Sequence, residues 1–188
     1  MKERIEMCLS GSGGQGLILA GIILAEAAGI YDGKEAVQTQ SYGPEARGGA
    51  SRSEVVISNN TIDYPKVIKS DILLALTQTA CDKYIKNLNE DGILVADSTL
   101  VTEVPTISNK IYLFPITETA QKIFGTRLVT NIISLGIIVG LTGVVSQEAI
   151  QKAVSSKVPV KAKEVNEKAL LLGFDVAKDL KAKKQESK

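Results

Sequence analysis

The sequence contains no histidine and no tryptophan, and only two of its 188 residues are cysteine. The absence of histidine excludes a Ser–His–Asp or Cys–His catalytic centre, a histidine-ligated metal and histidine proton transfer within this chain. Two thiols alone cannot ligate an iron–sulfur cluster, which normally takes four, and no Cys-x-x-Cys pair is present for zinc. One disulfide between Cys8 and Cys81 is conceivable, but two buried thiols in a reducing cytoplasm fit this composition better.

An excess of charge of one sign and a long apolar run are also missing. Lysines and arginines total 22 against 21 aspartates and glutamates, and this balance argues against a dedicated nucleic-acid binder. The most apolar stretch, residues 132–145, is shorter than the roughly 20 residues of a membrane-spanning helix. The charged first residues do not fit a signal peptide, so we expect a cytoplasmic protein without a membrane span.

Short apolar segments alternate with helical patterns along most of the chain. We expect the first helix to begin at Leu17 and the last clear helix to end before Gly173. We expect strands over residues 6–10, 35–41, 53–58, 71–76, 93–97 and 110–116. This alternation is typical of an α/β fold, here a Rossmann-like, mostly parallel sheet with helices on both faces and a candidate antiparallel strand pair within residues 35–62. Length and composition indicate one domain over residues 1–177, followed by a lysine-rich, frayed and solvated tail over residues 178–188.

A glycine-rich turn follows the first expected strand and opens the first expected helix. The residues of this segment, called the glycine turn below, are Gly11, Gly13, Gly14, Gln15 and Gly16. Three of the glycines have the G-x-G-x-x-G spacing, which lets the backbone approach an anion at a helix N-terminus. A dinucleotide site also needs an acidic residue at the end of the second strand, whereas Glu35 stands at its beginning. The turn therefore fits tight strand–helix packing without a ligand, binding of an anion or phosphate or, least well, dinucleotide binding.

A second unusual segment, residues 41–53, is called the arginine loop below. In it, Arg47 and Arg52 flank Gly48 and Gly49. Guanidinium groups bind carboxylates and phosphates through planar forks, and glycine keeps steric bulk away from them. Both segments adjoin strand ends, so we expect them to lie near each other. The arginines either pair locally or across a subunit contact, which is preferred, or bind an anionic substrate directly.

Two polar residues outside these segments have plain structural interpretations. Asp97 ends an expected strand and is predicted to cap the turn that follows it. Asn131 leads an apolar helix and is predicted to satisfy a buried backbone group. Neither residue names a function.

The glycine turn and the arginine loop together resemble a known family. The run GSGGQGLILAGIILAEAA from Gly11, followed by QSYGPEARGGASRSEVVIS from Gln40, resembles the gamma subunit of 2-oxoacid:ferredoxin oxidoreductases. Three later runs, DILLALTQ, KYIKNLNEDGILVAD and NIISLGIIVGL, fit the same family, and the resemblance covers residues 4–175. The QSYGPEARGG run is far more diagnostic than the glycine spacing.

The resemblance implies an enzyme that works only as an assembly. Such enzymes decarboxylate a 2-oxoacid on thiamine diphosphate, transfer the acyl group to coenzyme A and pass electrons through iron–sulfur clusters to ferredoxin or a similar acceptor. The resemblance implies alpha, beta and delta partner subunits that hold thiamine diphosphate, its magnesium and the clusters. This chain alone is then expected to bind no cofactor or metal and to carry no catalytic residue. A separate gamma chain favours 2-oxoglutarate as the substrate.

Under this resemblance, the glycine turn with Arg47, Gly48, Gly49 and Arg52 faces the reaction chamber or the coenzyme A phosphates, or instead clamps the alpha–beta core. Two other functions stay open: a stand-alone nucleotide- or flavin-binding Rossmann-like domain, and the small subunit of an indolepyruvate oxidoreductase. A gamma chain without its partners is expected to expose an apolar docking patch and to form a homodimer.

Overall fold

The computed structural model of the chain describes residues 2–41, 50–105 and 110–186. Within these residues, the strands are β1 (Arg4–Ser12), β2 (Glu35–Ser41), β3 (Ala50–Ser58), β4 (Ser70–Ala75), β5 (Leu88–Asp97) and β6 (Lys110–Phe114). The α-helices of the same part of the chain are α1 (Leu17–Glu26), α2 (Gln78–Tyr84), α3 (Ile116–Phe124), α4 (Thr130–Thr142), α5 (Gln147–Lys157) and α6 (Lys163–Glu186). A π-helical turn, Ala27–Tyr31, prolongs α1.

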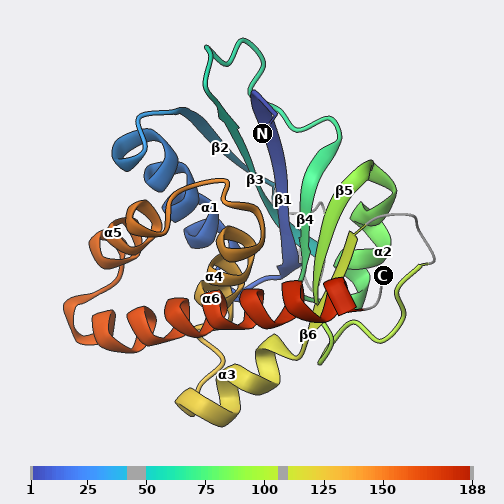
Figure 1. Cartoon of the computed structure of the whole chain (residues 1–188), viewed down its shortest axis with the longest axis vertical. Coiled ribbons are helices and arrows are strands. Elements are labelled where there is room, and N and C mark those ends of the chain that lie inside the picture. The colour runs from blue at the N-terminus through green and yellow to red at the C-terminus, as the bar shows by residue number, and fades with distance from the viewer. Residues whose placement is uncertain (1, 42–49, 106–109, 187–188) are drawn as a thin grey trace.

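The strands form one sheet in the order β2-β3-β1-β4-β5-β6 (Figure 1). β1, β4, β5 and β6 pair in parallel, whereas β3 pairs antiparallel with both β1 and β2. The mostly parallel sheet and the antiparallel pair within residues 35–62 are therefore confirmed. β5 begins earlier than expected, at Leu88, because α2 already ends at Tyr84.

Helices cover both faces of the sheet, as predicted, but unequally. One face carries α2, whose Ala80 and Cys81 pack in a smaller core against the sheet. The other five α-helices of the described residues contribute to a larger core on the opposite face. Successive residues of β1 alternate between the two cores, since Met7 and Leu9 lie in the larger core and Cys8 in the smaller.

The most apolar stretch of the sequence forms a buried helix. All residues of α4 are buried except Gly140 and Thr142. α6 crosses in front of α4, while the sheet lies behind it (Figure 1). A helix enclosed in this way has no polar face, which explains its unbroken apolar sequence. None of the described helices is long and apolar enough to cross a membrane.

The last helix is longer than the sequence predicts. α6 continues through Gly173 to Glu186, so the expected helix end before Gly173 and the expected fraying of residues 178–186 are both wrong. Residues 178–185 are exposed or half-buried, as expected of a solvated end. Gly173 serves a close helix crossing, because a Cβ at this position would lie 2.7 Å from the Cα of Gly136 in α4. Phe174 and Ala177 are buried beyond this crossing, so the helix stays attached to the core.

Candidate functional site

The glycine turn lies where the sheet reverses its winding direction. From β1 the chain passes through α1 to β2 at one edge of the sheet, whereas β4 leads to β5 and β6 at the other edge (Figure 1). In open α/β sheets, such a switch point leaves a crevice outside the carboxyl ends of the two central strands, where ligands bind. Here Gly11 still belongs to β1, where it pairs with Ser51 of β3, so the turn itself begins later than predicted, at Gly13. Residues 13–16 and 76–78 follow the carboxyl ends of β1 and β4.

The tip of the glycine turn is open and offers backbone donors. Gly14 and Gly16 have left-handed φ angles of 87° and 70°, a conformation that favours glycine. No heavy atom lies within 4 Å of the positions that a Cβ of Gly13 or Gly14 would occupy. α1 begins at Leu17, and no side chain caps its first N–H groups. This arrangement leaves room and hydrogen-bond donors for an anion.

Gln15, predicted as part of the binding turn, folds its side chain back onto the turn. Its Oε1 accepts a hydrogen bond of 2.7 Å from the backbone N–H of Ser12. Its Nε2 lies 3.5 Å from the carbonyl oxygen of Leu76, at the end of β4. A side chain on Gly11 would collide with Gln15 Oε1, so the glycine there makes this folded position available. Gln15 thus links the ends of β1 and β4, a role that the sequence analysis did not foresee.

Asn131 holds the other end of the glycine turn from the start of α4. Its Nδ2 donates a hydrogen bond of 3.1 Å to the carbonyl oxygen of Gly16, and its side chain is almost fully buried. The prediction that Asn131 satisfies a buried backbone group is therefore confirmed. A Cβ on Gly16 would lie 2.5 Å from this Nδ2, so the contact also requires a glycine at position 16.

The structure describes only part of the arginine loop. The candidate residues that lie outside the described part are Arg47, Gly48 and Gly49. Arg52 lies in β3, directly opposite Ser10 of β1. Its guanidinium forms an ion pair of 3.2 Å with Glu54 and stands 5.4 Å from the centre of the Tyr84 ring. Arg52 therefore faces α2, whereas the glycine turn leads into α1 on the opposite face, and Arg52 has the local pairing that the sequence analysis preferred.

The sheet order disfavours dinucleotide binding at the glycine turn. In a dinucleotide fold, the second strand lies beside the first and its end carries the acidic residue that binds the ribose. Here the antiparallel β3 separates β2 from β1. Glu35 stands at the start of β2, and this end of β2 is the one farther from the glycine turn.

The two thiols are structural. Cys8 and Cys81 are both free and buried, which bears out the preferred prediction of two thiols over a disulfide. Burial, with a smaller contribution from the charge of Glu54, raises the pKa of Cys8 to about 12, and burial also raises the pKa of Cys81. Thiols of this kind are poor nucleophiles and poor metal ligands. Across the described ranges, no cluster of three or more cysteine, aspartate or glutamate side chains could hold a metal ion.

The buried carboxylate of Asp97 also has structural partners. Its Oδ1 accepts a hydrogen bond of 3.0 Å from the N–H of Thr99, which confirms the predicted turn cap. Its Oδ2 accepts hydrogen bonds from the N–H, at 3.0 Å, and from the hydroxyl of Thr117 in α3. Asp97 therefore ties the end of β5 to the helix that follows β6.

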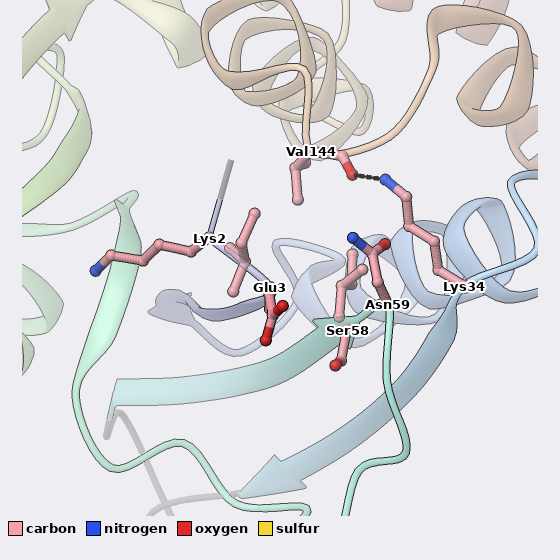
Figure 2. Close-up of a pocket in the computed structure, with 8 residues that line it drawn as sticks. Lys2, Glu3, Lys34, Ser58, Asn59 and Val144 are labelled. Carbon is pink, nitrogen blue, oxygen red and sulfur yellow. Dashed lines mark hydrogen bonds between the residues drawn. The ribbon is translucent and has the colours of Figure 1, made fainter.

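A cavity of about 150 Å³ lies at the opposite end of β1 from the glycine turn (Figure 2). Apolar side chains, those of Ile5, Ile57 and Val144, line part of it. Lys34 at its rim donates a hydrogen bond of 2.8 Å to the carbonyl oxygen of Val144, and Lys2 is paired with Asp71. Ligand pockets usually enclose about 300 Å³ or more, so this cavity is too small for a cofactor.

The fold and this site define an α/β, Rossmann-like domain that presents a glycine turn at the switch point of its sheet. The chain matches the family model described as "Pyruvate ferredoxin/flavodoxin oxidoreductase" over residues 6–176. It belongs to this family, and the resemblance drawn from the glycine turn and the arginine loop is confirmed.

Relatives and solved structures of similar length share the match. The chain is 50% identical to "2-oxoglutarate synthase subunit KorC" of Methanocaldococcus jannaschii, a similarity that spans 96% of this chain and 97% of the relative. It superposes with a TM-score of 0.85 and 55% identity on the keto/oxoacid ferredoxin oxidoreductase gamma subunit of Geobacter sulfurreducens, covering 92% of this chain and 98% of that one. The pyruvate oxidoreductase subunit PORC of Thermotoga maritima gives a TM-score of 0.77 at 27% identity, over 93% of this chain and 97% of the other.

Proposed function

We propose that this chain is the gamma subunit of a 2-oxoglutarate:ferredoxin oxidoreductase. The assembly converts the 2-oxoacid and coenzyme A to the acyl-coenzyme A ester and CO₂, and passes two electrons to ferredoxin or a similar acceptor. The observation that carries the proposal is the similarity, over almost the whole chain, to four KorC subunits at 38–50% identity. Relatives named for ketoisovalerate or pyruvate are less similar, at 29–32% identity.

The lengths of the relatives support a need for partner subunits. The chain spans 97% of the Methanocaldococcus KorC but only 37% of two ketoisovalerate oxidoreductase VorA subunits. The same domain therefore occurs both as a separate chain and within a longer one. A separate gamma chain associates with alpha, beta and delta subunits that carry the rest of the enzyme.

The chemistry of this chain supports a division of labour within the assembly. The sequence has no histidine, both thiols are buried, and the buried carboxylate of Asp97 is occupied by structural hydrogen bonds. Thiamine diphosphate, its magnesium and the iron–sulfur clusters belong to the partner subunits and supply the decarboxylation and electron transfer. This chain contributes backbone donors and shape.

The glycine turn is the part of the chain that serves the reaction most directly. With Arg47, Gly48 and Gly49, it faces the phosphates of coenzyme A. The open space beside Gly13 and the uncapped start of α1 support this role, because both leave N–H groups available to an anion. Arg52 pairs with Glu54 within β3 and faces α2, so it is not part of this proposed anion site.

The test is reconstitution of the purified complex followed by an assay with a panel of 2-oxoacids. We expect the highest kcat/KM with 2-oxoglutarate, lower values with pyruvate, ketoisovalerate and indolepyruvate, and no turnover by the chain alone. The matched control is the complex without this chain, which is expected to lose activity or to fail to assemble. Highest activity with an aryl 2-oxoacid would assign the chain to an indolepyruvate enzyme instead.

The stand-alone alternative has its own readout in the same preparation. A chain that folds as an independent nucleotide- or flavin-binding domain would purify with adenine or flavin absorbance and without larger partners. Catalytic turnover by the lone chain, or a bound flavin in it, would contradict the gamma-subunit proposal.

A further inference from the structure

The two edges of the sheet are protected to very different degrees. At one edge, β6 begins with Lys110, is followed by Pro115, and has the ammonium of Lys184 4.6 Å from the ring centre of Tyr112. At the other edge, β2 spans seven residues that contain no lysine and no proline, and its pairing with β3 runs without a bulge. Because an exposed strand edge invites pairing with another chain, natural sheets usually guard it with lysine, proline or a bulge. Within β2 itself the one charged residue is Glu35 at its start, next to Lys34, and the strand from Ala36 to Ser41 has none of these guards.

The helix beside β2 has an uncovered apolar flank. α1 turns Gly21 toward the sheet, where a Cβ would collide with the hydroxyl of Ser53 in β3 and lie 3.2 Å from Gln38 in β2. With about 100° per residue, two flanks extend from Gly21. The residues of the flank that faces the core are Ala20, Ile23, Leu24 and Ala27, and all are fully buried. The residues of the other flank, called the open flank below, are Ile18, Leu19, Ile22 and Ala25.

The open flank is partly exposed. Leu19 and Ile22 are 37% and 38% exposed, and α1 contains no charged residue before Glu26. An α-helix that is apolar all round is normally buried on every side. The open flank therefore lacks the cover that its sequence requires. α1 itself lies at the β2 side of the sheet, where Gly21 approaches Gln38 of β2 (Figure 1).

We propose that β2 and the open flank form a contact between two copies of this chain, related by a two-fold axis that passes beside Gln38. The two β2 strands pair antiparallel and join the two sheets into one. The two α1 helices then lie side by side on the same face of the joined sheet and cover each other's open flanks. The proposal concerns the chain itself and does not depend on the proposed function.

The spacing of the elements fits a second copy. Gly21 lies over the pair formed by β2 and β3. The helix axis of α1 therefore stands about one strand spacing, roughly 5 Å, from a two-fold symmetry axis placed just outside β2. Two copies related by that axis would place their α1 helices about 10 Å apart. This separation is at the upper end of the 8–10 Å at which packed helices lie. Large side chains such as Leu19 and Ile22 on the open flank suit this separation.

The residues of β2 are compatible with pairing to themselves. A two-fold axis at Gln38, the central residue of β2, sets Glu35 opposite Ser41, Ala36 opposite Gln40, and Val37 opposite Thr39. No two like charges face each other in this arrangement, which would otherwise disfavour the pair. A symmetric contact of this kind is the commonest way in which soluble chains form dimers.

The test measures the mass of the full-length chain in solution by light scattering after size exclusion. We expect twice the 20.0 kDa of the single chain. Ile22→Lys and Ile22→Glu are each expected to convert the dimer to a monomer, because each sets two like charges against each other across the axis. Mixing these two variants is expected to restore a dimer, which shows that both chains are folded. Leu171→Lys, at a 48% exposed site in α6, is the matched control and is expected to stay dimeric.

A single cysteine tests the position of the axis. Gln38→Cys is expected to form a disulfide between two copies under mild oxidation, because directly opposed residues of antiparallel strands have the Cα separation that a disulfide spans. Leu113→Cys in β6 is the control and is expected to stay unlinked. A monomeric wild-type chain, a dimer that survives Ile22→Lys, or cross-linking at position 113 instead of 38 would overturn the proposal. The native mass of the reconstituted complex is expected to include this chain in even number.

Discussion

Glycine serves two different purposes in two regions of this molecule. In the glycine turn, Gly14 and Gly16 adopt left-handed φ angles, and the tip of the turn meets no neighbouring atoms. Where α4 and α6 cross, Gly136 and Gly173 have ordinary helical geometry but no space, since a Cβ on Gly136 would lie 2.9 Å from the Cα of Gly173. The first region is open at its tip, whereas the second is closed and contributes only to stability.

The comparison shows that glycine is required for different physical reasons in the two regions. In the turn, Gly14 and Gly16 are needed for their backbone freedom, and only the space beside Gly13 and Gly14 is free of neighbouring atoms. In the crossing, glycine is needed because two helix backbones touch and no side chain fits between them. Substitutions therefore separate the two purposes by the size of their effect on stability and by whether they alter coenzyme A kinetics.

The largest effect is expected at the helix crossing. Gly173→Leu forces a side chain against the backbone of Ile133 and Gly136, so we expect the free energy of unfolding to fall by about 3 kcal/mol and Tm by roughly 6–12 °C. Thermal unfolding of the full chain measures this. Gly173→Ala is the more discriminating variant, because its higher helix propensity alone would raise the free energy of unfolding by up to about 1 kcal/mol. A higher Tm for Gly173→Ala would show that the helices do not meet as closely as described.

An intermediate effect is expected at the end of the glycine turn. Gly16→Ala places a Cβ at a left-handed φ of 70° and 2.5 Å from Asn131 Nδ2, so we expect a loss of about 2 kcal/mol. Denaturant unfolding of the variant measures the loss. In an Asn131→Ala background the collision is removed, and we expect the same substitution to cost only the backbone term of about 1 kcal/mol. Equal costs in the two backgrounds would contradict the contact between Gly16 and Asn131.

The smallest effect on stability is expected at the tip of the turn. Gly13→Ala adds a methyl group to open space at a residue without a positive φ, so we expect the free energy of unfolding to change by less than about 0.5 kcal/mol. If the turn receives the phosphates of coenzyme A, the same methyl group raises KM for coenzyme A in the reconstituted complex. KM for the 2-oxoacid is the internal control and is expected to stay the same. An unchanged KM for coenzyme A would remove the turn from coenzyme A binding.

Local patterns predicted the elements of this fold well. The six strands, the buried character of α4, the turn cap at Asp97 and the backbone contact of Asn131 all follow from periodicity and from the chemistry of single side chains. Gly173 was misread because a glycine in a helical pattern is as consistent with a helix end as with a close crossing. Only the opposing Gly136, distant in the sequence, distinguishes the two.

The candidate site was predicted only in part. The spacing of the glycines located the turn, but it did not predict the partners of Gln15 and Arg52. These partners are Leu76, directly after β4, Tyr84 of α2, and Glu54, two residues along β3 from Arg52. The sequence pattern predicted an antiparallel pair but not its place in the sheet. The position of β3 between β1 and β2 is known only from the structure.

The sequence by itself determined what chemistry this chain lacks, its α/β class and its family, because composition and contiguous motifs are local properties of the chain. The tertiary structure alone decided which strand edge is left unguarded, which flank of α1 is uncovered and which face Arg52 occupies. Strand order and helix crossings depend on hydrogen bonds and contacts between residues far apart in the sequence, so they exist only once the chain has folded.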